Sequence, residues 1–342
     1  MQDERPQDHD EQRIPDSGMP AEHPSSPGAD PREAALREAL ELAGRRASAP
    51  PLHPVGFAFL LVLVTFVAYQ VMGGVITYLL FGLETSENIA GVRAVTVISQ
   101  LLFLALPAAL LLRFMGWELR KALRLHMPRL LPLLVTVVSV IALQFVVQAW
   151  VELQDYALRR WLLPDFLMPL LDTFEELLEE LYGQLLAMHT PVEALTVWVV
   201  VALTPAFCEE VLFRGAVQWS FEKKMRLRWA FLLSGAIFSF FHLNPVTFIP
   251  LAMLGVYFSV LTWRGDSLWY AVAAHATNNT IAVVALYIFR SENLLPVDAA
   301  SGEPSLGMYA ASGSIALTVF AICVWYFWTL TANPATTGEA AL

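Results

Sequence analysis

The sequence predicts an all-α fold, a polytopic transmembrane bundle of about eight helices preceded by a disordered N-terminal tail. Hydrophobic residues make up 56% of the 342 residues and charged residues 15%, whereas soluble domains contain about 45–50% and about 25%. A soluble globule cannot bury this much apolar surface. Several apolar runs also approach the roughly 20 residues that a spanning helix requires. These observations predict an integral membrane protein.

The N-terminal segment differs in composition from the rest of the chain. Residues 1–50 are polar and rich in Pro, Asp, Glu and Ser. They have no apolar core of the kind that a signal peptide contains, and they cannot bury a hydrophobic face. We therefore expect a disordered acidic tail over residues 1–50 and a transmembrane helical domain over residues 51–334.

Eight apolar runs are candidate spans. In chain order they are Val55–Gly82, Val92–Phe114, Leu130–Val151, Leu195–Phe221, Trp229–Leu243, Thr247–Trp263, Leu268–Phe289 and Tyr309–Leu330. The fifth and sixth are short and only Asn244-Pro245 separates them, so they can also be interpreted as one broken or re-entrant unit. Basic residues gather in the second and fourth loops, which predicts that both termini are cytoplasmic. The composition, rich in alanine and arginine, favours a bacterial plasma membrane.

The segment Asp165–Met188 is amphipathic. Leucines recur at helical spacing on one side, and four glutamates occupy the other. This pattern predicts a helix at the membrane surface and not a span. Two interpretations are open: a helix packed on the bundle, or a lid over a substrate entrance.

Ionisable groups inside the hydrocarbon are costly, and each is a candidate functional residue. The spans contain Glu209, Glu210 and Arg214 in the fourth, His242 at the end of the fifth, and His275 with Asn279 in the seventh. A helical rise of 1.5 Å places Glu209, His242 and His275 roughly 16–21 Å from cytoplasmic basic residues, near the middle of a ~30 Å core. This common depth predicts one buried polar site.

The helical spacing suggests which side chains face this site. Glu210 and Arg214 are four residues apart and form the natural ion pair, because a buried arginine needs a carboxylate. Glu209 lies about 100° around the helix from Glu210 and is freer to face a cavity. His275 and Asn279, also four residues apart, project from one face.

These residue types fit the hydrolysis of an acyl bond, and we expect a peptide bond. Glu209 can act as general base on water and His242 can position that water. Histidine and asparagine can donate hydrogen bonds to the oxyanion of a tetrahedral intermediate. Alternatively, Glu209, His242 and His275 could bind zinc, although no HExxH spacing supports this. The polar groups could also simply hold helices together.

Other features limit the function. No basic block indicates nucleic-acid binding. Cys208 and Cys323 both lie in apolar runs, so neither a disulfide nor a CxxC zinc site is implied. The expected partners are the lipid bilayer and a peptide or protein substrate that enters from the membrane or the cytoplasmic side.

Three motifs resemble those of the CPBP family, which contains the CAAX prenyl endopeptidases and the bacteriocin-processing (Abi) proteins. They are Glu209-Glu210-x-x-x-Arg214, Phe238-x-x-x-His242 and His275-x-x-x-Asn279, within residues 191–289. The resemblance implies an eight-helix intramembrane endopeptidase. In it Glu209 activates water, His242 assists, and His275 and Asn279 form the oxyanion site. Family members are described both as glutamate proteases and as metalloproteases, so the resemblance leaves zinc open.

Two other classes of function are compatible with the sequence. The first is a non-catalytic membrane protein, an immunity or scaffold factor that retains the fold. The second is a transporter, because polar groups at mid-depth beside the Asn244-Pro245 break fit a broken-helix site. The chain has no detectable inverted repeat, which argues against a transporter.

Overall fold

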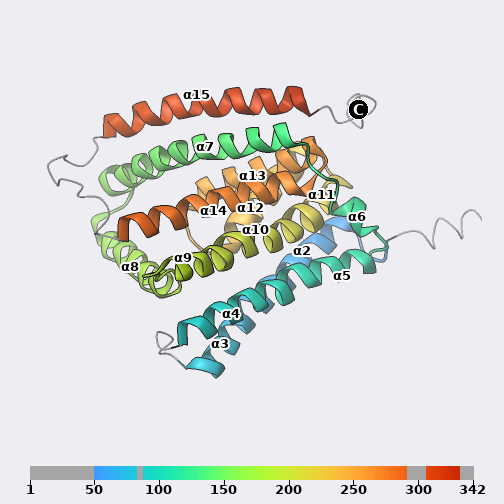
Figure 1. Ribbon diagram of the computed structural model, residues 1–342, viewed down its shortest axis with the longest axis horizontal. Helices are drawn as coiled ribbons and strands as arrows, with labels where there is room; N and C mark the ends of the chain where they lie inside the picture. Colours follow the sequence, from blue (N-terminus) through green and yellow to red (C-terminus); the bar gives the residue numbers. More distant parts are fainter. Residues whose placement is uncertain (1–49, 83–87, 291–305, 332–342) are drawn as a thin grey trace, which may run out of the picture. The chain divides into compact units, whose positions relative to one another are not determined.

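The computed structural model describes residues 50–82, 88–290 and 306–331 (Figure 1). Within these ranges all regular structure is helical, which confirms the predicted all-α class. The tail predicted over residues 1–50 lies outside the described residues, apart from Pro50.

Seven helices in the described part of the chain are long and apolar enough to cross a membrane. Four are composite: Pro54–Phe81 (α2 Pro54–Phe66 and α3 Gly73–Phe81), Ile89–Phe114 (α4 Ile89–Gln100 and α5 Leu106–Phe114), Leu130–Leu162 (α7 Leu130–Ala157), and Pro191–Glu222 (α9 Pro191–Trp198, α10 Thr204–Glu210 and α11 Trp219–Glu222). The others are α13 Phe248–Gly265, α14 Leu268–Arg290 and α15 Leu306–Leu330.

The fifth predicted span is a shorter helix than the others. It forms α12, Leu227–Phe241, whose 15 residues extend about 22 Å at 1.5 Å per residue. This length does not cross a ~30 Å core, so the structure has seven long apolar helices and one short one where eight spans are expected. The helix ends early because the chain turns at His242–Pro245 and then begins α13.

Helices α12 and α13 pack backbone to backbone. A Cβ atom added to Gly255 would lie 2.7 Å from the Cα of Gly235, closer than real Cβ atoms approach. The two glycines therefore let the helices come together without side chains between them. Near the end of α12, Ser239 also donates a hydrogen bond to the backbone oxygen of Phe248, the first residue of α13.

The composite helix Pro191–Glu222 is the most buried of the seven. Of its most apolar 18-residue window, 56% is buried, against 17% in α15. It begins with a capping box. The Thr190 side chain accepts a hydrogen bond from the backbone N–H of Glu193, and the Glu193 side chain accepts one from the backbone N–H of Thr190. A wider π-type segment, Val211–Gln218, follows α10 directly. The central helix is thus the one that carries Glu209 and Glu210.

The predicted amphipathic segment forms helix α8, Met168–Leu185, preceded by a short turn of helix. Its end is held by the buried Arg93 of α4, which donates hydrogen bonds to the backbone oxygens of Leu185 and Ala187. A positive charge at the C-terminal end of a helix is favourable, because the carbonyl groups there carry partial negative charge. Arg93 thereby fixes α8 to the bundle.

Candidate active site

Several of the predicted site residues line one cavity of about 480 Å³. Its walls include Glu209 of α10, His242 after α12, and His275 and Asn279 of α14, together with Phe238. Three segments far apart in sequence therefore meet at one site.

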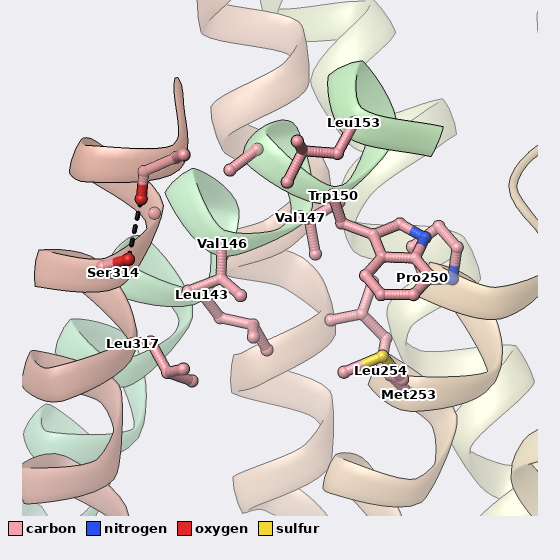
Figure 2. A pocket seen from close by; sticks show the side chains of 13 residues that line it. Leu143, Val146, Val147, Trp150, Leu153, Pro250, Met253, Leu254, Ser314 and Leu317 are labelled. Atoms are coloured by element: carbon pink, nitrogen blue, oxygen red, sulfur yellow. Dashed lines mark hydrogen bonds between the residues drawn. The ribbon is translucent and has the colours of Figure 1, made fainter. Parts of the chain in front are cut away.

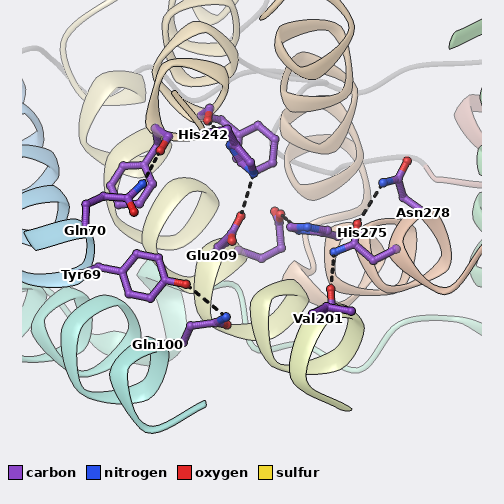
Figure 3. A network of polar contacts seen from close by, with 12 residues as sticks. Tyr69, Gln70, Gln100, Val201, Glu209, His242, His275 and Asn278 are labelled. Carbon is purple, nitrogen blue, oxygen red and sulfur yellow. Dashed lines mark hydrogen bonds and ion pairs between the residues drawn. The ribbon is translucent and has the colours of Figure 1, made fainter. Parts of the chain in front are cut away.

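The side chains of Glu209 and His242 face each other in this cavity (Figure 3). Glu209 Oε2 lies 3.8 Å from His242 Nε2, and the side chains are 13% and 30% exposed. A nitrogen–oxygen hydrogen bond is usually 2.7–3.2 Å long, so the two atoms face each other without a direct bond. Glu209 Oε2 has no hydrogen-bond partner among the described residues.

The position of His242 follows from the local chain geometry. His242 is the C-cap of α12, and the next residue, Leu243, has a left-handed backbone with φ of 53°. Such a residue commonly ends a helix, but a leucine there is strained because of its Cβ atom. Asn244 Oδ1 then accepts hydrogen bonds from the backbone N–H groups of Val246 and Thr247. This turn explains why Asn244-Pro245 separates two apolar helices.

One hydrogen bond determines the tautomer of His242. Its Nδ1 lies 2.8 Å from the carbonyl oxygen of Phe238, one turn earlier. A carbonyl oxygen only accepts, so Nδ1 carries a proton. In the neutral ring, Nε2 therefore presents a lone pair toward Glu209.

Glu210 and Arg214 form a buried network with His275, which lines the cavity. Arg214 Nη1 donates to Glu210 Oε1 at 3.0 Å, and both side chains are fully buried. The ion pair inferred from the helical spacing is thus present. Arg214 also donates to the carbonyl oxygen of Gly255 and lies over the ring of Phe238, 4.5 Å from its centroid.

His275 contacts Glu210, a pairing that the sequence spacing did not predict. His275 Nδ1 lies 2.9 Å from Glu210 Oε1, so the two histidines of the cavity are held by different groups. Because a carboxylate accepts, Nδ1 carries the proton and Glu210 fixes the orientation of the ring. Phe258 stacks on this ring with centroids 5.5 Å apart.

Asn279 is positioned by its own set of contacts. Its Nδ2 donates to the carbonyl oxygen of Val201 at 2.9 Å, and its Oδ1 accepts from Asn278 at 3.0 Å. Asn278 Oδ1 in turn accepts from Gln144 of α7. An amide nitrogen has two hydrogens, so Asn279 keeps a second donor beyond the one that Val201 uses. Asn278 thereby links α14 to α7.

The first two membrane helices contribute a polar wall that the motifs did not reveal. Tyr69, Gln70 and Gln100 line the same cavity. Gln100 Nε2 donates to Tyr69 Oη at 3.4 Å, and Gln70 Nε2 donates to the carbonyl oxygen of Phe241 at 2.9 Å. The only available signal was the presence of glutamines within long apolar runs.

The zinc alternative requires three ligands that converge. Among the residues that the structure describes, no group of three or more His, Cys, Asp or Glu side chains is placed to hold a metal ion. The Nδ1 atom of His275 faces Glu210, and Nδ1 of His242 faces a carbonyl oxygen. These contacts leave Nε2 of both rings free, as in metal-bound histidines, but the described side chains are not brought together as three ligands, and we derive no step through a metal.

A second cavity of about 240 Å³ lies between α7, α13 and α15 (Figure 2). Its walls are almost wholly apolar and include Leu143, Trp150, Met253 and Leu317. Leu254 lines both this cavity and the one that contains Glu209. The two cavities are therefore neighbours with one side chain in common.

Comparison with known families agrees with this arrangement. Residues 191–281 match the family described as type II CAAX prenyl endopeptidase Rce1-like. The match spans about a quarter of the chain and includes all three motifs, which confirms the resemblance drawn from them. Searches of curated proteins and of solved structures found no match. The matched region and the seven apolar helices fit an integral membrane protein with a CAAX-type intramembrane protease fold.

Proposed function

We propose that this Rce1-like protein is an intramembrane endopeptidase that hydrolyses a peptide bond with a water molecule activated by Glu209. The observation that carries the proposal is the pair formed by Glu209 Oε2 and His242 Nε2, 3.8 Å apart on the wall of a cavity.

With the His242 ring neutral, both atoms of this pair are hydrogen-bond acceptors. The carboxylate accepts, and Nε2 of His242 accepts because Nδ1 carries the proton. Two acceptors that face each other are satisfied by one molecule with two donors, and water is the smallest such molecule. A water that donates to both would direct its lone pairs into the cavity, toward a substrate carbonyl.

The reaction then needs no further group beyond those in the cavity. The water oxygen attacks the carbonyl carbon, and Glu209 takes the proton as general base. The second N–H of Asn279 donates to the negative oxygen that forms; His275 donates to it through Nε2–H when the ring carries both protons, because its Nδ1–H is used by Glu210. Glu209 returns the proton to the leaving nitrogen as the C–N bond breaks. The products are a carboxylic acid, which ionises to the carboxylate, and an amine, which takes up the released proton.

The neighbouring apolar cavity favours a prenylated substrate. A farnesyl chain is wholly apolar, and the cavity between α7, α13 and α15 shares Leu254 with the catalytic cavity. A prenylated cysteine close to the scissile bond could place its chain there. This would match the CAAX prenyl substrates that give the Rce1-like family its description.

Peptide cleavage by the purified protein in proteoliposomes tests the proposal. The probe is an internally quenched peptide ending in Cys-Val-Leu-Met, with S-farnesyl cysteine or free cysteine. We expect Glu209→Gln to lower kcat about 10²- to 10⁴-fold, the usual contribution of a general base. Glu176→Gln, at an exposed position of α8, is the matched control and should cleave normally.

The other classes of function give different results. A non-catalytic immunity or scaffold protein would cleave no probe, and its cellular phenotype would survive Glu209→Ala. A transporter would move a solute across the vesicle membrane and would release no peptide product. Full cleavage by Glu209→Gln would refute the role of Glu209 as general base, but the assignment as a peptidase would stand.

A further inference from the structure

We propose that Gln100 positions the substrate by accepting a hydrogen bond from one of its main-chain N–H groups. This inference rests on the proposed function, because it assigns a peptide to the cavity that contains Glu209. Gln100 lies at the end of α4, outside the residues 191–281 that the family match covers.

The Gln100 side chain lines the cavity and has a buried acceptor without a partner among the described residues. It is only 4% exposed, and it lines the cavity of Glu209 and His242. Its Nε2 donates to Tyr69 Oη, while its Oε1 has no partner among the described residues. A buried carbonyl oxygen without a donor is unfavourable, and such groups in native structures usually have a partner. A bound ligand with an N–H group would supply it.

The wall that carries Gln100 is fixed relative to the catalytic pair. Gln70, one residue after Tyr69, donates to the carbonyl oxygen of Phe241, and Phe241 directly precedes His242. Phe66 and Phe241 also meet edge to face with ring centroids 5.3 Å apart. A substrate held by Gln100 would therefore have a defined position relative to His242.

The composition of the cavity identifies the kind of donor. Among its described lining residues, Glu209 is the only carboxylate and there is no lysine or arginine. Apart from the polar groups already described and Thr96, the walls consist of aliphatic and aromatic side chains. Such walls do not select charged substrate side chains. A main-chain N–H, present at nearly every residue of any peptide, is the donor that suits an isolated amide oxygen.

Binding measurements can test this role separately from catalysis. The full-length Glu209→Gln protein in detergent would bind a fluorescent S-farnesyl peptide ending in Cys-Val-Leu-Met, read by anisotropy. Adding Gln100→Met, which keeps the length of the side chain, should weaken binding about five- to tenfold, the effect of one neutral hydrogen bond. Gln148→Met is the matched control: Gln148 lies on α7 and its amide bonds to Glu152 of the same helix. It should leave binding unchanged.

Ester-substituted peptides show whether the lost contact is the proposed one. In this series, one amide N–H at a time is replaced by oxygen. One position should weaken binding about five- to tenfold when Gln100 is present and should have no effect in Gln100→Met. A purely structural role for Gln100 would leave the ester penalties equal in both proteins. Equal penalties, or unchanged binding by Gln100→Met, would overturn the inference.

The outcomes also separate this inference from the proposed function. If the Gln100-dependent ester penalty is found but the wild-type protein cleaves none of the probes, the peptidase proposal fails and the binding role of Gln100 stands. If the wild-type protein cleaves the peptide and the ester penalties do not depend on Gln100, only the inference fails. A peptide that is neither bound nor cleaved contradicts both.

Discussion

Replacing Arg214 with methionine should destabilise the protein more than almost any other single substitution. Methionine resembles the apolar stem of arginine but removes the charge. Arg214 and Glu210 are both fully buried, and Arg214 Nη1 lies 3.0 Å from Glu210 Oε1. The substitution leaves the carboxylate of Glu210 buried without its cation. Breaking a buried pair in this way costs about 3–5 kcal/mol, a large part of the 5–15 kcal/mol that typically stabilises a folded protein.

A double-mutant cycle isolates the interaction from the other contacts of Arg214. Glu210→Gln removes the charge but keeps an oxygen that can accept from His275 Nδ1 and from Arg214. The double variant Glu210→Gln/Arg214→Met contains no unpaired buried charge. We therefore expect it to lose less stability than the sum of the single variants, by about 1–3 kcal/mol. It should also be more stable than Arg214→Met alone.

Thiol accessibility gives a convenient assay for this cycle. Cys208 is fully buried and lies on the same helix as Glu210, so a thiol-reactive dye reports the unfolding of this helix. Cys323, which is partly exposed, would be replaced by alanine in all variants. Labelling across a denaturant titration in detergent gives the free energies. A cost below about 1 kcal/mol for Arg214→Met, or strict additivity in the cycle, would refute the account of this network.

Three further predictions test other parts of the structure. Gly255→Ala should separate α12 from α13, because the added Cβ would lie 2.7 Å from Gly235 Cα. We expect it to lower both the stability and the cleavage rate. Gly56→Ala is the control: its added Cβ meets nothing within 4 Å, so neither quantity should change. Ser314→Phe should fill the apolar cavity and slow cleavage of the farnesylated peptide about tenfold while sparing the unprenylated one; equal effects on both would exclude the cavity as a prenyl site. A chelator should leave cleavage unchanged, and activity that disappears with EDTA and returns with zinc would instead favour the metal alternative.

The parts of the site that were predictable from sequence depend on local spacing. Glu210 and Arg214 are four residues apart on one helix, so their pairing needs no knowledge of other helices. His275 and Asn279 share a face of α14 for the same reason, and both line the cavity. The apolar runs likewise predicted the helices, because their length alone indicates a span.

The remaining features depend on packing between helices. The contact of His275 with Glu210 joins residues 65 positions apart, and no periodicity indicates which of two adjacent glutamates it meets. Gln100 reaches the cavity from a helix that carries no motif. The end of α12 at Phe241 depends on the left-handed backbone of Leu243, a conformation that the identity of a leucine argues against.

Single-turnover hydrolysis in ¹⁸O-labelled water tests the central claim most directly, namely that Glu209 activates a water molecule that attacks the substrate. With enzyme in excess over the farnesylated peptide, this mechanism predicts one ¹⁸O atom in the new carboxylate of the product after the first turnover, detected by mass spectrometry. If Glu209 instead attacked the substrate itself, water attack on the Glu209 carbonyl of the acyl intermediate would leave an unlabelled first product and label in Glu209. Unlabelled product, or no product at all, would contradict the mechanism proposed for this cavity.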